Sequence, residues 1–187
     1  MIYICLFSRR WIVITKVAKN ASSGVGIAEK ISFREPTADD GSEMFRIVEE
    51  SKVLDVNSSY SYLMWGKYFS KSSIVAELDG ELIGFVTGFL QPNSPNTLFV
   101  WQVAVDPKHR GKKLATRLIE TLLAEQKSND VCYLEATVTP NNIPSSKLFK
   151  GIAKKFETDC VISECFSEEQ FPDSSHEPEM TYRIGPF

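Results

Sequence analysis

The spacing of apolar and polar positions along the chain predicts a domain that alternates strands and helices. Strand-like segments lie at residues 31–34, 74–78, 81–90, 97–105, 131–138, 160–166 and 180–184. Apolar residues that alternate with polar ones, or that run continuously between turn residues, are typical of strands with one or both faces buried. Asp79-Gly80 predicts a hairpin between two of these strands. The proline- and asparagine-rich segment 92–96 predicts a loop before the next strand.

Helical spacing of apolar residues predicts the elements between the strands. Helices are expected after the N-cap candidates Thr37, Asp39 and Asp40, within 60–69, within 113–126, and after Pro140-Asn141-Asn142. The 113–126 segment places its leucines on one face, as a helix that packs on a sheet does. The predicted order is β-α-α-β-β-β-α-β-α-β-β, a single α/β domain.

Size and charge narrow the possible functions. The 187 residues suffice for one domain with a sizeable core, and 43% hydrophobic and 24% charged residues are ordinary values for a globular protein. A net charge of −3 argues against a nucleic-acid partner. Residues 1–30 are expected to be a non-core extension of the domain at 31–187. Arg9 and Arg10 interrupt the apolar start, so a membrane span is not expected, although a peripheral anchor is the alternative.

The cysteines and histidines do not predict a metal site. Cys5, Cys132, Cys160 and Cys165 form no Cys-x-x-Cys pair, and the chain has only two histidines. Because the last three cysteines lie in strand-like runs, they are expected to be buried thiols of a reducing compartment, which favours a cytoplasmic location.

Residues 101–117 predict a strand, a basic turn and a helix in direct succession. The turn contains Lys108, His109, Arg110 and Lys112 beside Gly111. The first N–H groups of a helix have no partner within the helix, and the helix dipole adds partial positive charge there. This arrangement favours a phosphate or pyrophosphate as ligand, with a solvated basic loop as the alternative.

The turn resembles the acyl-CoA pyrophosphate loop of the GCN5-related N-acetyltransferases. Arg110 and Ala115 match the two ends of that family's pattern, and Lys113 stands where a glycine is usual. A helical backbone conformation would tolerate a side chain at Lys113. The resemblance implies acetyl-CoA as co-substrate, with its pyrophosphate bound by Arg110, Gly111, Lys112, Lys113, Leu114 and Ala115.

The order of elements resembles the same family over the whole of residues 31–185. The resemblance implies a mixed, mostly antiparallel sheet of about seven strands flanked by helices, with pantetheine paired to the backbone of Val103, Ala104 and Val105. It also implies that Asn142 hydrogen-bonds the pantetheine, although a helix N-cap is an equal alternative. Phe149 stands where many members have a tyrosine that protonates the leaving thiolate.

Four stretches closely resemble the L-2,4-diaminobutyrate acetyltransferases of ectoine biosynthesis, a group within that family. They are Asp-x-Asn-x-x-Tyr at 55–60, Phe-Val-Trp-Gln-Val-Ala-Val at 99–105, Leu-Glu-Ala-Thr-Val-Thr-Pro-Asn-Asn at 134–142 and His-Glu-Pro-Glu at 176–179. The resemblance implies acetylation of the γ-amine of L-2,4-diaminobutyrate, a role in osmoprotection, and a homodimer. Another small diamine, diamino acid or protein N-terminus is the alternative acceptor, and an acyl-CoA sensor without catalysis is a further reading.

An acceptor amine near pKa 10 is mostly protonated at neutral pH, so the site must bind a cation and remove a proton. Asp55 is expected to hold an ammonium group, and Glu177 or Glu179 to hold the second amine or accept its proton. Trp101 is expected to pack on the aliphatic carbons and offer a cation–π contact.

Five other residues are candidates for the acceptor site. Asn57 and Tyr60 are expected to orient the substrate, Gln102 lies beside Trp101 on the central strand, and His176 is a candidate proton relay. Glu135 either faces the site or pairs with a basic neighbour. The alternatives are a turn residue for Asp55, core packing for Trp101, solvated loop charges for Glu177 and Glu179, and a surface position for His176.

Overall fold

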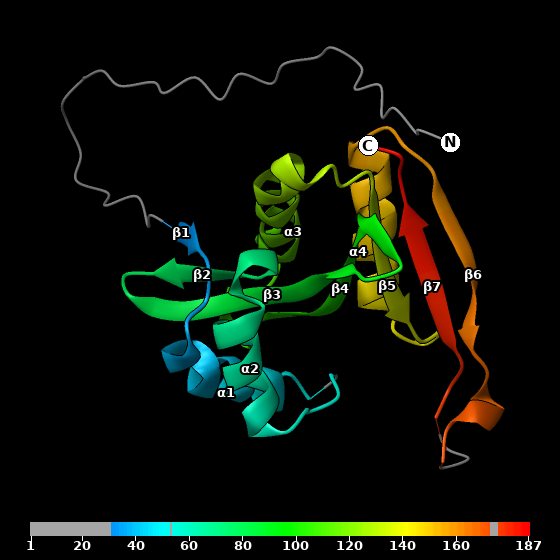
Figure 1. Cartoon of the computed structure of the whole chain (residues 1–187). Coiled ribbons are helices and arrows are strands. Elements are labelled where there is room, and N and C mark those ends of the chain that lie inside the picture. The colour runs from blue at the N-terminus through cyan, green and yellow to red at the C-terminus, as the bar shows by residue number, and fades with distance from the viewer. Residues whose placement is uncertain (1–30, 53, 173–175) are drawn as a thin grey trace.

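The fold is built on one mixed sheet of seven strands. The computed structural model describes residues 31–52, 54–172 and 176–187; the predicted extension at 1–30 lies outside them. The strands are β1 (Ile31–Arg34), β2 (Ile74–Leu78), β3 (Glu81–Gln91), β4 (Ser94–Val105), β5 (Tyr133–Val138), β6 (Cys160–Phe166) and β7 (Glu179–Ile184). Their order in the sheet is β1-β2-β3-β4-β5-β7-β6 (Figure 1). Among the strands that the structure describes, only β4 and β5 are parallel neighbours, which confirms the mixed, mostly antiparallel sheet.

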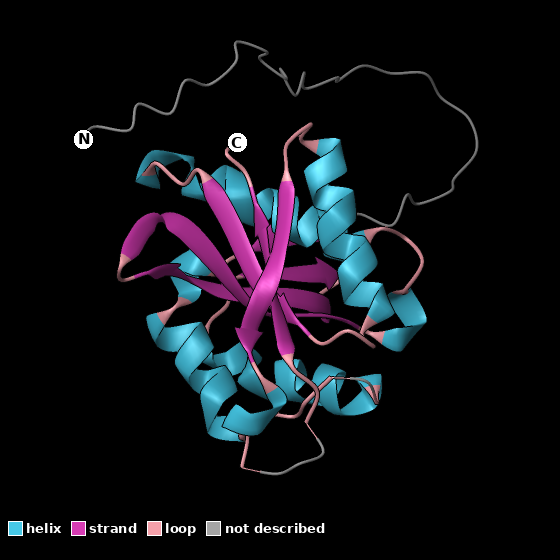
Figure 2. Ribbon diagram, turned by 90° about the vertical axis from the view of Figure 1, so that its right-hand side faces the viewer, coloured by secondary structure: helices cyan, strands magenta, loops and turns pink. Residues whose placement is uncertain are grey.

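Helices cover both faces of the sheet. They are α1 (Gly41–Ser51), α2 (Ser59–Tyr68), α3 (Leu114–Glu125) and α4 (Ile143–Lys155). Figures 1 and 2 show α1 and α2 on one side of the sheet and α3 and α4 on the other. Alternate residues of a strand point to opposite faces, so Val75 packs in a core with α1 and α2, while Ile74 and Ala76 pack in the core with α3 and α4. None of the described helices combines the length and apolar character needed to cross a bilayer.

Three sequence expectations about elements need correction. The segment 92–96 is not all loop, because β4 already begins at Ser94, which pairs with Gln91 across a two-residue turn. The predicted helix at 113–126 begins at Leu114. Cys160 is only half-buried and Cys165 is exposed, because β6 is the edge strand of the sheet and most of its residues are exposed; among the three cysteines expected inside, only Cys132 is buried.

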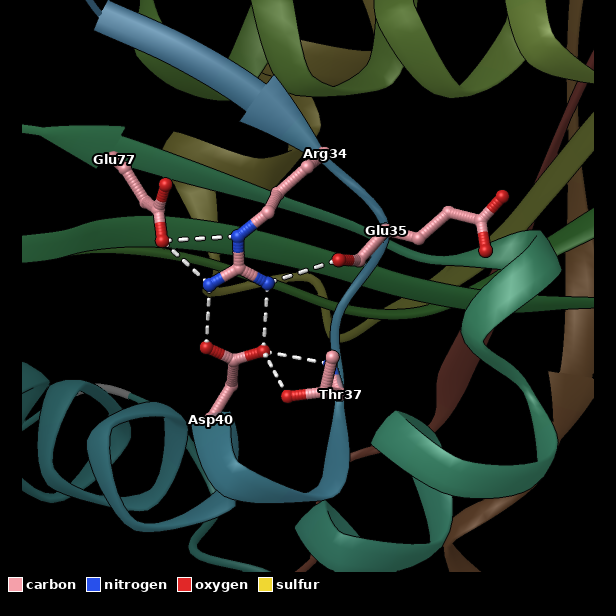
Figure 3. Close-up of polar contacts among 5 residues, drawn as sticks. All are labelled: Arg34, Glu35, Thr37, Asp40 and Glu77. Atoms are coloured by element: carbon pink, nitrogen blue, oxygen red, sulfur yellow. Dashed lines mark hydrogen bonds and ion pairs between the residues drawn. The ribbon is translucent and has the colours of Figure 1, made fainter. Parts of the chain in front are cut away.

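A charged network fixes the chain where it leaves the sheet for α1 (Figure 3). The Arg34 guanidinium donates to both carboxylate oxygens of Asp40, at 2.7 and 2.8 Å, and its Nε donates to Glu77 Oε1 at 2.9 Å. The Thr37 N–H also donates to Asp40, at 2.6 Å. Burial acts to raise the pKa of Asp40, but these hydrogen bonds outweigh it, and the pKa lies below its usual value. Asp40 therefore ties β1 and β2 to the start of α1.

The sheet opens between its two parallel strands. Pairing of β4 with β5 extends only from Thr97 to Phe99, so the rest of β4 has a free backbone edge on that side. A bulge lies at the same place, because Thr87 faces Gln102 while Gly88 faces Val100, which leaves Trp101 as the extra residue. A Cβ on Gly88 would lie 2.5 Å from the Phe99 carbonyl oxygen, so this close approach needs glycine.

Candidate active site

The opening between β4 and β5 forms a cleft of about 740 Å³. Its walls come from the segment after α1, from β4 and β5, from the start of α4, and from the segment before β7. The sequence-predicted residues that line it are Asp55, Asn57, Trp101, Gln102, Val103, Asn142, Phe149, His176, Glu177 and Glu179. The cleft thus brings together segments that are far apart in the chain, from Leu54 to Glu179. Ligand sites in α/β proteins commonly lie in such clefts.

Glu179 is the cleft residue whose electrostatic surroundings are most unusual. Its Oε2 is buried and has no hydrogen-bond partner among the described residues. Burial raises the pKa of Glu179, and the negative charges of Asp55 and Glu177 raise it further, while a hydrogen bond from Thr137 and the charge of His176 act the other way. A half-buried carboxylate with a vacant acceptor atom can bind an ammonium group and take its proton.

Glu177 differs from Glu179 because its carboxylate is already engaged. Its Oε2 accepts the Asn141 backbone N–H at 3.1 Å, and its Oε1 accepts the Asn141 side-chain amide. These bonds connect the segment before β7 to the turn before α4. Sequence reasoning missed Asn141, which it placed only in the turn that opens the helix.

His176 is held by its neighbours in the cleft wall. Its Nδ1 lies 2.6 Å from the Glu177 carbonyl oxygen, and its ring stacks on Phe171 at a centroid distance of 3.7 Å. The carbonyl can only accept, so the neutral ring carries its proton on Nδ1 and leaves Nε2 as an acceptor.

Trp101 is a wall of the cleft and not a core residue. Its side chain is 51% exposed, and its ring lies against Trp65 of α2 at a centroid distance of 6.0 Å. The bulge in β4 explains this position, since it turns the extra residue away from the core.

Two predicted acceptor residues lie outside the cleft lining. Tyr60 is 67% exposed at the start of α2. The Glu135 carboxylate pairs with Arg183 and accepts the Gln91 side-chain amide, so of its two alternatives the structure shows the pair with a basic neighbour.

The basic turn before α3 has the geometry of an anion site. Asp106 caps a single helical turn at Pro107–His109 by accepting the Lys108 N–H at 2.9 Å. Arg110 donates to the carbonyl oxygens of Val105, at 3.4 Å, and Ser51, at 3.5 Å. The space around the Gly111 Cα is open, which leaves room for a ligand against the backbone.

The backbone of this turn corrects one expectation. Lys113 does not adopt a right-handed helical conformation; its φ of 57° is left-handed and places it just before α3 as the N-cap. A left-handed residue reverses the chain direction sharply, and glycine does this at less cost than lysine. Leu114, which follows, buries its side chain in the core, so it can offer only its backbone to a ligand.

Asn142 and Phe149 connect α4 to the cleft. Asn142 Oδ1 accepts the Ser145 N–H at 3.1 Å and caps α4, and the residue also lines the cleft. The Phe149 ring is buried against Tyr182 of β7, whose hydroxyl donates to Ser146 Oγ at 2.9 Å. Among the described residues, no group of three or more His, Cys, Asp or Glu side chains is placed to hold a metal ion.

Comparison with known proteins gives consistent matches. A model of the acetyltransferase (GNAT) family matches residues 41–152. The chain is 49% identical to an L-2,4-diaminobutyric acid acetyltransferase of Marinococcus halophilus over 162 residues, which cover 87% of this chain and 94% of the relative. It is 48% identical to the enzyme of the same name from Virgibacillus pantothenticus over 151 residues, which cover 81% of this chain and 95% of that relative.

A solved structure agrees with this match. The diaminobutyrate acetyltransferase EctA from Paenibacillus lautus, in complex with its substrate L-2,4-diaminobutyric acid and coenzyme A, superposes with a TM-score of 0.80. The two chains are 35% identical, and the match covers 84% of this chain and 96% of the solved one.

Proposed function

Because this chain belongs to the acetyltransferase (GNAT) family, we propose that it transfers the acetyl group of acetyl-CoA to the γ-amine of L-2,4-diaminobutyrate. The product is N4-acetyl-diaminobutyrate, and the reaction is a step of ectoine biosynthesis. The observation that carries this function is the cleft itself. One wall is the free backbone edge of β4, and the opposite wall holds Glu179, a half-buried carboxylate with a vacant oxygen. The family match at 41–152 supports placing the catalytic domain at 31–187.

The donor side of the cleft fits acetyl-CoA. The turn before α3 offers the unpaired N–H groups of the first helical turn, the basic side chains of 108–113, and open space at Gly111. β5 does not pair with Val103, Ala104 or Val105, and Val103 lines the cleft together with Asn142. When bound there, acetyl-CoA supplies an activated acetyl group as a thioester. A backbone N–H of β4 polarises its carbonyl.

The acceptor side fits a short diamino acid. Asp55 holds one ammonium group, Trp101 packs against the aliphatic carbons, and Asn57 orients the carboxylate. Glu179 accepts the proton of the attacking amine, because its raised pKa makes it a stronger base than an ordinary carboxylate. Glu177 holds the cleft wall in place through Asn141, and His176 is a second route for the proton. Phe149 has no acidic hydrogen, so it cannot protonate the leaving thiolate.

The proposed function is tested by release of CoA thiol from acetyl-CoA in the presence of L-2,4-diaminobutyrate. Ornithine, lysine, putrescine and a blank without amine are run beside it, and the acetylated position is read by NMR. Strong preference for diaminobutyrate with acetylation at N4 is the expected result. Equal turnover of the longer amines would mean that the enzyme accepts a broader class of diamines. Binding of CoA without any turnover would indicate an acyl-CoA sensor.

We also infer that the protein acts as a cytoplasmic homodimer. The edge strand β6 supports an assembly, because Val161, Ile162 and Phe166 expose apolar side chains there. Both proposed substrates are metabolites of the cytoplasm. Size-exclusion chromatography with light scattering distinguishes a dimer from a 21.1 kDa monomer.

A further inference from the structure

The segment that carries Asp55 is joined to β4 by two side chains, Gln102 from the cleft lining and Tyr62 from α2. Gln102 Nε2 donates to the Asp55 carbonyl oxygen at 3.1 Å. The Tyr62 hydroxyl, from α2, donates to Gln102 Oε1 at 3.2 Å. Asp55 thus depends on a chain of two hydrogen bonds that joins residues 40 and 47 positions apart in the sequence.

Tyr62 is a rigid end point for this chain. Its side chain is 1% exposed, and its ring meets Phe45 and Phe85 edge to face at 5.9 and 6.2 Å. Burial raises the pKa of Tyr62, although hydrogen bonds with Asn57 and Gln102 oppose the shift. Burial therefore favours the protonated phenol, which is the form that donates to Gln102.

The two bonds also fix the orientation of the Gln102 amide. Because the Asp55 carbonyl oxygen can only accept, the NH₂ group must point toward it, which leaves the amide oxygen to accept from the Tyr62 hydroxyl. Gln102 follows Trp101, the extra residue of the β4 bulge, so the same short segment of strand sets the positions of Trp101 and of Asp55.

We propose that Tyr62 and Gln102 are positioning residues that decide which amine of the acceptor reaches the thioester. They hold Asp55 at a fixed distance from β4, where it takes the α-ammonium group, so the γ-amine is presented for attack. The inference rests on the proposed function and deepens it. Loosening the segment should allow the substrate to bind in the reverse orientation, with its α-amine at the thioester.

The test is Tyr62→Phe, which keeps the packed ring and removes only the hydroxyl. We expect the KM for diaminobutyrate to rise about three- to tenfold, the range that one lost hydrogen bond implies, while the KM for acetyl-CoA stays within about twofold. The fraction of product acetylated at the α-nitrogen should rise. Tyr68→Phe is the matched control, because Tyr68 ends the same helix and is exposed. It should leave all three values unchanged.

Gln102→Met and the double variant complete the experiment. Gln102→Met should reproduce the defect, and the double variant should be less severe than the sum of the two single ones, since both substitutions break the bond between Tyr62 and Gln102. If the wild type does not acetylate diaminobutyrate, the proposed function fails and this inference fails with it. If the wild type does, and Tyr62→Phe changes neither the KM for diaminobutyrate nor the product ratio, only this inference is overturned.

Discussion

The side chain of Glu179 combines its proposed catalytic use with a cost to folding. Its pKa is raised chiefly by burial, so the folded state disfavours its charged form. A carboxyl of this kind contributes stability below its unfolded-state pKa and loses that contribution as the pH rises through its folded-state pKa. Glu179→Gln should therefore raise Tm at pH 8 and leave it nearly unchanged near pH 4, while kcat/KM falls about 100-fold or more for loss of the base. Thermal unfolding at the two pH values and steady-state kinetics measure both effects.

Glu177→Gln is the matched control for that experiment, because it makes the same change two residues away. Its carboxylate is bound to Asn141, so we expect a lower Tm at pH 8 and a smaller loss of activity. A drop in activity equal to that of Glu179→Gln would mean that the two carboxylates share the proton. It would contradict the proposal that Glu179 is the base and that Glu177 only holds the cleft wall.

At the scale of the element, helix α2 reaches its place only because Gly66 has no side chain. A Cβ there would lie 2.1 Å from the Thr37 carbonyl oxygen and 2.8 Å from the Ala38 nitrogen, and both are backbone atoms that cannot turn away. Gly66→Ala should lower the free energy of unfolding by about 3 kcal/mol or more, since α2 must shift. Equilibrium unfolding in urea measures this change in the free energy of unfolding.

Gly151→Ala provides the comparison for Gly66→Ala, because it lies in α4 with open space at its Cα. At that position, the higher helix propensity of alanine should raise the free energy of unfolding by about 0.5–1 kcal/mol. Equal effects of the two substitutions would contradict the close approach of α2 to Thr37.

The Asp40 network should make the free energy of unfolding depend on pH in the acidic range. A folded-state pKa below the usual 3.8 contributes stability above that value and loses it as the pH falls through the folded-state pKa. Asp40→Asn should cost roughly 1–2 kcal/mol at pH 7, a figure reduced for the partly exposed Arg34. The difference from wild type should shrink toward pH 2. Asp39→Asn, an exposed neighbour, should cost little at any pH, and a constant deficit for Asp40→Asn down to pH 2 would argue against the ion pair.

Sequence patterns predicted the elements better than their surroundings. Periodicity found every strand of the sheet, because burial of alternate residues leaves a local signature. It expected Cys165 to be inside, since an apolar run does not reveal that its strand lies at an edge. Likewise, Asp55 and Glu179 could be chosen as acids near the cleft, whereas Tyr62 could be placed only in a segment beside the predicted site, without a role. Its role depends on Gln102, a contact 40 positions away that no local pattern contains.

At the scale of the whole molecule, α1 joins the donor and acceptor sides of the cleft. Its Arg46 donates to Asp106 at 3.3 Å, and its last residue, Ser51, accepts from Arg110 of the basic turn. The same helix leads directly into the segment that carries Asp55. The turn that is proposed to bind pyrophosphate is therefore held by the element that precedes the acceptor wall, and its stability depends on that contact.

Ligand binding to this turn should stabilise the folded chain as one unit. CoA at about 100 times its Kd contributes about 2.7 kcal/mol, which for a domain of this size is a rise in Tm of roughly 5–10 °C. Asp106 is buried, and the hydrogen bonds from Lys108 and Arg46 keep its pKa below the usual value although burial acts to raise it. Asp106→Asn retains an acceptor for the Lys108 N–H but loses the charge that Arg46 faces.

We expect Asp106→Asn to raise the KM for acetyl-CoA about three- to tenfold, to leave the KM for diaminobutyrate nearly unchanged, and to reduce the CoA-induced rise in Tm. Glu43→Gln is the control, because Glu43 is another partner of Arg46 but lies exposed on the surface of α1. It should change neither constant, since exposed pairs contribute little. Equal losses in the affinities for both substrates would show that α1 transmits the change to the Asp55 segment, and a normal Tm rise in Asp106→Asn would show that the turn binds CoA without the support of α1.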